Sequence, residues 1–386
     1  MQIVADREIP QVTEAFAQYG QVKLVTGRDL TPDQLGDAEI LLVRSVTKVN
    51  AALLDGSSIR LVGTATSGTD HLDESYLLDR NIERFDAAGC NARAVAEYIL
   101  ACLILHQRTL SRGFEQLQVG IVGFGHVGKM VYQLLSALGI RCVVNDPLLL
   151  SKEMESAPAR VSLDEVLVSD VITLHVPYTE IGPFPTHELL GGAELARLKP
   201  DALLINAARG GVVDEAALME WKTHNPSATM AIDCWREEPA IDLRLLRLAS
   251  FASPHIAGYT AEARLRATRM LVEKMAAKLD GDQTWPTPVA KSLGLHLQGD
   301  GHRLKIIGEA VLHCCNPTTS TNDLRRTIGL PALRRSAAFD ELRRGAVGRR
   351  EFSAYSIASE SLQPDTVSDL CALGFNITNS GSQNDG

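Results

Sequence analysis

The chain has 386 residues, of which 45% are hydrophobic. This length is sufficient for two or three domains with substantial cores. A net charge of -9 at pH 7 argues against general binding to nucleic acids or to anionic membranes, because both of these partners are themselves negative.

Short apolar runs alternate with amphipathic stretches in the first part of the chain. Strands are predicted at residues 2–5, 23–26, 40–43 and 61–65, with a first helix at 11–19 and further helical pieces between the strands. This alternation predicts a parallel sheet that is covered by helices on both faces.

A long apolar helix at 94–105 leads into a second series of the same kind. The predicted strands are 119–122, 142–146, 171–176, 203–206, 230–234 and 251–253. The predicted helices are 127–138, 193–198, 215–224 and the long amphipathic segment 261–279. The fold class is therefore α/β, with two doubly wound parallel sheets.

A break follows the last of these helices. Gly281-Asp282 and Trp285-Pro286-Thr287-Pro288 indicate a domain boundary. Beyond it the composition changes, with arginine pairs at 325–326, 334–335, 343–344 and 349–350. Residues 376–386 are polar and rich in Gly, Ser and Asn, so a frayed tail is expected there.

Targeting and metal-binding signals are not evident. The first six residues carry no cationic start, and no apolar run reaches about 18 residues, so neither a signal peptide nor a membrane span is expected. The seven cysteines are scattered, without a C-x-x-C or zinc-finger spacing. We expect no metal site, and free thiols in a reducing cytoplasm.

A glycine loop joins the predicted strand 119–122 to the helix that follows it. Its sequence is Gly123-Phe124-Gly125-His126-Val127-Gly128. In this context the first glycine permits a tight turn, the second lets the backbone approach a pyrophosphate, and the third lets the helix pack on its strand. The pyrophosphate would bind the N–H groups at the helix N-terminus. The loop therefore predicts a dinucleotide cofactor.

Asp146 ends the next predicted strand, 18 residues after Gly128. A carboxylate at that position is typical of a hydrogen-bond acceptor for the adenosine ribose, and its charge repels a 2′-phosphate. Pro147 and Leu148 follow it, without an adjacent arginine. The sequence thus favours NAD over NADP.

Three more segments fall at the carboxyl ends of predicted strands, where open α/β sheets bind ligands. They are NAARGGVVD at 206–214, DCWREEP at 233–239 and SPHIAGY at 253–259. Together with the glycine loop they resemble the D-2-hydroxyacid dehydrogenase family, with four motifs in the family's order. The resemblance covers about residues 1–285 and implies NAD-dependent oxidation of a small D-2-hydroxy acid.

The chemistry of that reaction explains three residues in these segments. The hydroxyl proton needs a base, for which His255 is the candidate. Glu238 would orient the ring and support the imidazolium. It is chosen over Glu237 because it directly precedes Pro239, as in the family pattern. Arg209 can bind the carboxylate with both arms of its guanidinium group.

The N-terminal half resembles one branch of the family. This resemblance rests on the segments VRSVTKVN at 43–50, VGTATSGTDH at 62–71 and GCNA at 89–92. The resemblance implies a cytoplasmic homodimer that converts 4-phospho-D-erythronate to 2-oxo-3-hydroxy-4-phosphobutanoate in pyridoxal 5′-phosphate biosynthesis. It also implies substrate contacts by Ser45, Thr66 and Tyr259, and places Val176, Ala207, Asp233 and Gly258 near the nicotinamide end of NAD.

The same resemblance implies a division of the chain. Residues 1–93 and 257–286 would form a flavodoxin-like, substrate-binding lid domain, and 94–256 an NAD-binding Rossmann domain. Residues 287–380 would form an α+β dimerisation domain that can be removed to leave an NAD-binding monomer, and 381–386 a flexible tail. A phosphorylated hydroxy acid needs a second cation. Arg44 is the candidate, with Arg349 or Arg350 of a second subunit as an addition.

Three alternatives remain at this level. Another D-2-hydroxy acid, such as 3-phosphoglycerate, would use the same chemical residues. A non-enzymatic, NAD(H)-sensing corepressor is also compatible with an intact Arg, Glu and His set, although the acidic balance weighs against it. The arginine pairs could suggest a nucleic-acid patch. The first three pairs recur every nine residues, however, which is about half a helical turn out of phase, so they would not form one stripe.

Overall fold

The computed structural model describes residues 1–110, 113–149, 158–279, 285–286, 292–297 and 301–378. The chain divides into two compact units. The first unit comprises Met1–Asn91 and Ala261–Val289, and the second comprises Ala92–Thr260 and Ala290–Gly386. Within the described residues, none of the helices has both the length and the apolar character needed to cross a membrane.

The first unit contains a five-stranded sheet in the order β2-β1-β3-β4-β5. All neighbouring strands are parallel. The strands are β1 Gln2–Asp6, β2 Gln21–Val25, β3 Ile40–Val43, β4 Leu61–Thr64 and β5 Glu83–Asp86. Its helices are α1 Val12–Phe16, α2 Ala51–Leu54, α3 Glu74–Asp79 and α10 Ala261–Leu279.

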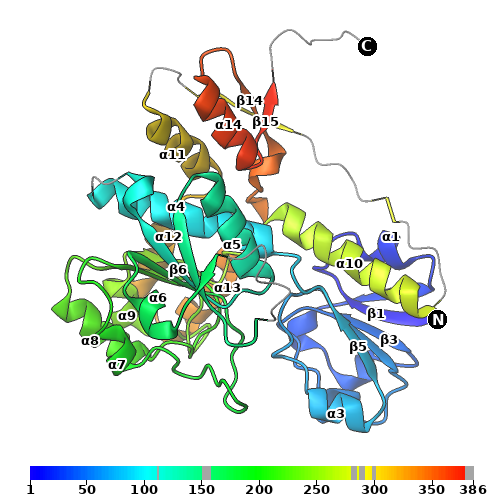
Figure 1. The fold of residues 1–386 in the computed structure, drawn as a ribbon. Coiled ribbons are helices and arrows are strands. Elements are labelled where there is room, and N and C mark those ends of the chain that lie inside the picture. Colours follow the sequence, from blue (N-terminus) through cyan, green and yellow to red (C-terminus); the bar gives the residue numbers. More distant parts are fainter. Residues whose placement is uncertain (111–112, 150–157, 280–284, 287–291, 298–300, 379–386) are drawn as a thin grey trace. The chain divides into compact units, whose positions relative to one another are not determined.

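Helices cover both faces of this sheet, as Figure 1 shows. On one face, Ile3 and Leu42 share a core with side chains of α1 and α10. On the other face, Val4 and Leu41 pack with side chains of α2 and α3. The alternation of neighbouring residues between two apolar cores explains why these strands read as continuous hydrophobic runs.

The second unit contains a seven-stranded parallel sheet in the order β12-β11-β10-β9-β6-β7-β8. The strands are β6 Gln118–Val122, β7 Arg141–Asn145, β8 Ala159–Arg160, β9 Val171–Leu174, β10 Leu203–Asn206, β11 Thr229–Ile232 and β12 Phe251–Ala252. The order reverses between β6 and β9, so the carboxyl ends of these two strands flank the crevice in which such sheets bind ligands.

Two helical layers enclose the seven-stranded sheet. On one face lie α4 Ala92–Leu110 and α5 His126–Ala137, which pack side by side (Figure 1). The core of the other face takes side chains from α6 Leu163–Leu167, α7 Gly192–Leu195, α8 Glu215–His224 and α9 Leu243–Leu248. The prediction of two doubly wound parallel sheets is confirmed.

The C-terminal segment adds a three-stranded parallel sheet in the order β13-β14-β15. Its strands are β13 Leu293–Leu295, β14 Tyr355–Ala358 and β15 Asn376–Thr378. Its helices are α11 Arg303–Cys314, α12 Pro317–Arg326, α13 Ala332–Gly345 and α14 Pro364–Ala372. Buried residues of this segment, among them Ile307, Phe352 and Leu370, belong to the same hydrophobic core as Leu100 of α4.

Some local expectations were wrong. Helix α1 is limited to five residues, because 17–19 form turns that lead to Gly20, where a Cβ would lie 2.0 Å from the Met1 carbonyl oxygen. Strands β5 and β8 were not predicted: β5 is charged and partly exposed, and β8 has two residues. Residues 376–378 form β15 and are not a frayed tail. The expectations for 281–282, 287–288 and 381–386 lie outside the described residues.

Candidate active site

The glycine loop connects β6 to α5 in the second unit. Gly123 has a φ of 90°, and a Cβ there would lie 2.7 Å from the carbonyl oxygen of His175. At Gly128 a Cβ would lie 2.1 Å from the carbonyl oxygen of Gly123, so this turn of α5 lies directly on the loop. Open space surrounds the Cβ position of Gly125, the residue that caps α5. The N–H groups of His126 and Val127 begin the helix beside that space, as an anion site requires.

Asp146 lies one residue beyond β7, which ends at Asn145 rather than at the predicted aspartate. One carboxylate oxygen of Asp146 accepts a hydrogen bond from the N–H of Phe124 (2.8 Å), and the other from the N–H of Leu148 (2.9 Å). The side chain thus holds the glycine loop against the end of β7. It also places a negative charge beside the loop, where a carboxylate can accept bonds from ribose hydroxyls and repel a phosphate.

His255 and Glu238 form a hydrogen-bonded pair. The imidazole Nδ1 lies 2.9 Å and 3.0 Å from the two carboxylate oxygens of Glu238, and the pair is partly buried. Because a carboxylate can only accept, Nδ1 carries the proton and Nε2 is the basic nitrogen of the neutral ring. Glu238 also accepts a hydrogen bond from the N–H of Trp235 (2.9 Å). This arrangement suits a general base whose positive form is stabilised by a neighbouring anion.

The environment of Glu238 keeps its carboxyl group ionised. Burial raises its pKa, but the charge and hydrogen bond of His255, together with the Trp235 N–H and the charge of Arg343, have the larger combined effect. The pKa of Glu238 therefore lies below its ordinary value. An ionised carboxylate here stabilises the imidazolium that forms when His255 takes a proton.

Asp233 holds the loop that carries His255. Its buried carboxylate accepts hydrogen bonds from the hydroxyl of Ser253 (2.6 Å), the N–H of Ile256 (2.8 Å) and the N–H of Ala257 (3.0 Å). The N–H of His255 donates to the main-chain carbonyl of Asp233 (2.9 Å). His255 itself has a φ of 56°. This left-handed conformation is costly for a residue other than glycine, and the surrounding hydrogen bonds hold it.

Arg209 lies three residues after the end of β10. The side chain of Asn206 accepts from the N–H of Ala208 (3.2 Å) and donates to the carbonyl of Arg209 (2.9 Å), which fixes the turn. At Gly210 a Cβ would lie 2.0 Å from the carbonyl oxygen of Trp235, so the two segments lie directly against each other. The structure thus brings the segments of Arg209, Glu238 and His255 to one edge of the sheet.

Cys234 lies beside this pair. Its Sγ, a carboxylate oxygen of Glu238 and a nitrogen of His255 all lie within 4.8 Å of one another. Three such atoms could ligate a transition metal. Burial raises the pKa of the Cys234 thiol well above its ordinary value, and the thiol donates to the carbonyl of Ala208 (3.4 Å). Because the thiol already has an acceptor and the other two groups bond to each other, we assign Cys234 to packing.

The remaining predicted site residues are divided between the two units. Ser45 is exposed on the first unit, and the Thr66 hydroxyl donates to the carbonyl of Gly68 (2.9 Å). Val176 and Ala207 follow β9 and β10. Gly258 and Tyr259 follow the His255 loop, where the N–H of Tyr259 donates to Ile256.

Two of the predicted phosphate ligands have partners within this chain. The guanidinium of Arg44 forms two bonds with the buried carboxylate of Asp6, at 2.9 Å and 3.4 Å. Arg349 donates to the carbonyl oxygens of Ala94, Ile256 and Ala257. Arg349 is therefore bonded within its own chain, and its contact with a second subunit's substrate stays a prediction. These contacts join residues far apart in sequence, which is why sequence motifs did not reveal them.

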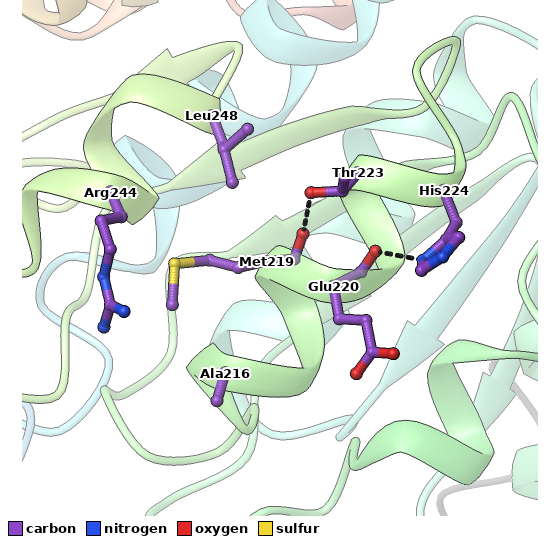
Figure 2. A pocket seen from close by; sticks show the side chains of 7 residues that line it. All are labelled: Ala216, Met219, Glu220, Thr223, His224, Arg244 and Leu248. Atoms are coloured by element: carbon purple, nitrogen blue, oxygen red, sulfur yellow. Dashed lines mark hydrogen bonds between the residues drawn. The ribbon is translucent and has the colours of Figure 1, made fainter.

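A surface hollow of about 480 Å³ lies elsewhere, over α8 and α9. Figure 2 shows that Met219 and Leu248 lie along it, with Glu220, His224 and Arg244 around them. None of these residues belongs to the four motifs. This hollow is therefore separate from the chemical groups described above.

Comparisons with known proteins point to one family. Residues 91–257 match the family described as D-isomer specific 2-hydroxyacid dehydrogenase, NAD binding domain. The chain is similar to the erythronate-4-phosphate dehydrogenase of Hahella chejuensis, with 38% identity over 98% of this chain and 100% of the relative. It is also similar to that of Marinobacter nauticus, with 39% identity over 98% and 100% of the two chains.

Solved structures agree on the fold. The D-lactate dehydrogenase of Aquifex aeolicus, complexed with NAD and lactic acid, matches 75% of this chain and 100% of its own, with 25% identity and a TM-score of 0.63. The NAD⁺-bound 3-phosphoglycerate dehydrogenase of Entamoeba histolytica has 22% identity and a TM-score of 0.62, with coverage of 76% and 99%.

Proposed function

Because this chain belongs to the erythronate-4-phosphate dehydrogenase family of D-isomer specific 2-hydroxyacid dehydrogenases, we propose that it oxidises 4-phospho-D-erythronate with NAD. The similarity extends over 98% of the chain, C-terminal segment included. The chemical observation that supports the reaction is the Glu238–His255 pair, at the same sheet edge as Arg209. The product is 2-oxo-3-hydroxy-4-phosphobutanoate, an intermediate of pyridoxal 5′-phosphate biosynthesis.

The residues of the glycine loop fit the cofactor. Open space at Gly125 leaves room for the pyrophosphate at the N-terminus of α5, next to Gly123, His126, Val127 and Gly128. The carboxylate of Asp146 would accept hydrogen bonds from the hydroxyl groups of the adenosine ribose. Val176, Ala207, Asp233 and Gly258 would line the nicotinamide end. When bound, NAD accepts a hydride from the substrate carbon that bears the hydroxyl group.

The chain itself supplies the acid–base chemistry. His255 Nε2 takes the hydroxyl proton, and Glu238 stabilises the imidazolium that results. Arg209 binds the substrate carboxylate and polarises the carbonyl that develops next to it. Ser45, Thr66 and Tyr259 contact the substrate, and Arg44 contributes charge near its phosphate.

Two further properties belong to the proposal. We infer a homodimer formed through residues 287–380, by the family resemblance. We also infer a cytoplasmic location, which the free cysteines among the described residues support, because oxidising compartments favour disulfides.

The test is turnover of purified protein with a panel of D-2-hydroxy acids. NAD and 4-phosphoerythronate are supplied, with and without a 2-oxo acid that can reoxidise NADH on the enzyme. Product formation with 4-phosphoerythronate at a higher kcat/KM than with 3-phosphoglycerate or D-lactate supports the proposal. A preference for either of the other acids would contradict it.

A further inference from the structure

The side chain of Arg349 spans two parts of the second unit. Its Nη2 donates to the carbonyls of Ala94 on α4 (2.6 Å) and Ala257 (2.7 Å), and its Nη1 donates to the carbonyl of Ile256 (3.2 Å). Ile256 and Ala257 directly follow His255 in the sequence. A C-terminal arginine, about 90 residues away along the chain, is therefore bonded to the His255 loop.

Glu351 and Phe352 extend this contact. The carboxylate of Glu351 is buried and accepts a hydrogen bond from the hydroxyl of Thr260 (3.2 Å), which is also buried. The N–H of Phe352 donates to Glu97 of α4 (3.0 Å). Residues 349–352 therefore connect α4 with the His255 loop. We call these four residues the clamp.

Asp233 and the clamp together hold three consecutive peptide groups, and both of them bind the group that joins Ile256 to Ala257. Asp233 accepts the N–H groups of Ile256 and Ala257, while Arg349 donates to the carbonyl groups of these two residues. The peptide groups that follow His255 are thus fixed between a buried carboxylate and a guanidinium group. A buried carbonyl left without its donor is unfavourable, so the clamp stabilises one conformation of this loop.

We propose that Arg349 and Glu351 are positioning residues for the reaction, and that the clamp sets His255 in place against Glu238. Only the expected effect on turnover rests on the proposed function. The C-terminal segment then has a part in each subunit's own active site, in addition to any interface that it forms. The clamp and Asp233 help to hold the left-handed conformation of His255, which is costly for a residue other than glycine.

Substitutions of Arg349 can test this proposal, because arginine and lysine differ in how they donate hydrogen bonds. The planar fork of arginine donates to three carbonyl oxygens at once, whereas a lysine ammonium is a single point of charge on a flexible stem. Arg349→Lys keeps the charge but loses the fork, and Arg349→Met removes both. Glu351→Gln keeps the side-chain shape and an acceptor for Thr260. Arg344→Met is the matched control, because Arg344 is exposed at the end of α13.

Each full-length variant is first examined by thermal melting and NAD binding, and then by kcat, KM and the proton NMR signal of the His255 Nδ1–H. That signal appears far downfield only while the N–H is held by the carboxylate. His255→Ala identifies it. For Arg349→Met we expect kcat to fall about 10- to 100-fold through misplacement of the base, with little change in KM or NAD affinity. The downfield signal should weaken, and Arg349→Lys should recover part of both.

Two results would overturn the proposal. One is a folded Arg349→Met protein with wild-type kcat and a wild-type Nδ1–H signal. The other is an equal loss in Arg344→Met. If Arg349→Met does not fold, Arg349→Lys decides by the same criteria, and Glu351→Gln, which keeps the acceptor for Thr260, should stay close to the wild type. The NMR signal can be measured without substrate. A wild-type protein without turnover would therefore contradict the proposed function, and the effect of the clamp on His255 could still be tested by NMR.

Discussion

Both carboxylate oxygens of Glu238 lie within 3.0 Å of His255 Nδ1. This double contact prevents a 180° flip of the imidazole ring, because the flip would place the ring carbon Cδ2 against the carboxylate. The basic Nε2 is therefore held in one orientation by a residue 17 positions away in the sequence. Glu238 is in turn held by the N–H of Trp235.

Removal of the base is the first prediction. His255→Ala should lower kcat by about 10²- to 10⁴-fold, the usual contribution of a general acid–base group. NAD binding, measured by fluorescence titration, should be nearly unchanged. Glu238→Gln should lower kcat by less, because it removes the anionic partner of the imidazolium but leaves the base itself in place. Near-normal turnover of His255→Ala would remove this residue from the mechanism.

The cofactor preference gives the second prediction. Asp146→Ala should weaken NAD binding and reduce discrimination against NADP, since it removes the repulsive charge and the acceptor for Phe124 N–H. Asp146→Asn is the matched control. It removes the charge but keeps an oxygen acceptor, so it should relax NADP discrimination with a smaller loss of NAD affinity. Dissociation constants for both cofactors provide the measurement, and equal wild-type affinity for them would contradict this role.

The parallel sheets and the segments that carry Arg209, Glu238 and His255 could be predicted from the sequence because their signals are local. The strand at 203–206 and the helix at 215–224 match β10 and α8 residue for residue. Arg209, Glu238 and His255 each follow a strand of one sheet, and parallel strands end at one edge. Their common location then follows from topology alone.

The supporting contacts could not be predicted in this way. Asp6 and Arg44 are 38 residues apart, and Arg349 and Ala94 are 255 apart, with no motif to connect them. The short strand β8 has too few residues to show a period. Such features depend on which surfaces meet after folding, and that information is not present in any single window of the sequence.

Arg44 provides the third prediction, because its ion pair with Asp6 gives it a structural task. Arg44→Ala should lower the free energy of unfolding by roughly 3 kcal/mol, since it leaves the buried Asp6 carboxylate without its cation. Asp6→Asn in the same chain should recover part of this loss in urea unfolding. If Arg44 also binds the substrate phosphate, Arg44→Ala should raise KM for 4-phosphoerythronate far more than for D-erythronate. An equal effect on both substrates would show that the residue only supports the fold.

The fourth prediction revises the expectation that the chain can be cut at Pro286. Ile307, Phe352 and Leu370 share a core with Leu100, and full burial of each such side chain contributes about 1.5–3 kcal/mol. A chain that ends at Pro286 should therefore lose cooperative folding in a circular dichroism melt. Ile307→Ala, a milder change to the same core, should cost about 2–5 kcal/mol. A truncated protein that melts cooperatively and binds NAD would contradict this.

Glu97 gives the last prediction, which concerns stability and pH. This fully buried carboxyl accepts from Arg93 (2.7 Å) and from the Phe352 N–H of the clamp. Burial raises its pKa, and the charge of Glu351 adds to this effect; Arg93 and the hydrogen bonds lower the pKa by less, so it reaches about 7 from an ordinary value of 4.5. The folded state therefore binds a proton more tightly than the unfolded state does.

The sign of the pH effect follows from that difference. The stabilisation is complete below pH 4.5 and is lost as pH rises through 7, with a slope of up to about 1.4 kcal/mol per pH unit between these values. Glu97→Gln cannot titrate, so its free energy of unfolding, measured in urea from pH 5 to 8, should fall less steeply with pH than that of the wild type. The exposed Glu341→Gln should keep the wild-type slope. A Glu97→Gln protein whose slope equals the wild type's would mean that Glu97 stays ionised throughout, and that Arg93 compensates fully for its burial.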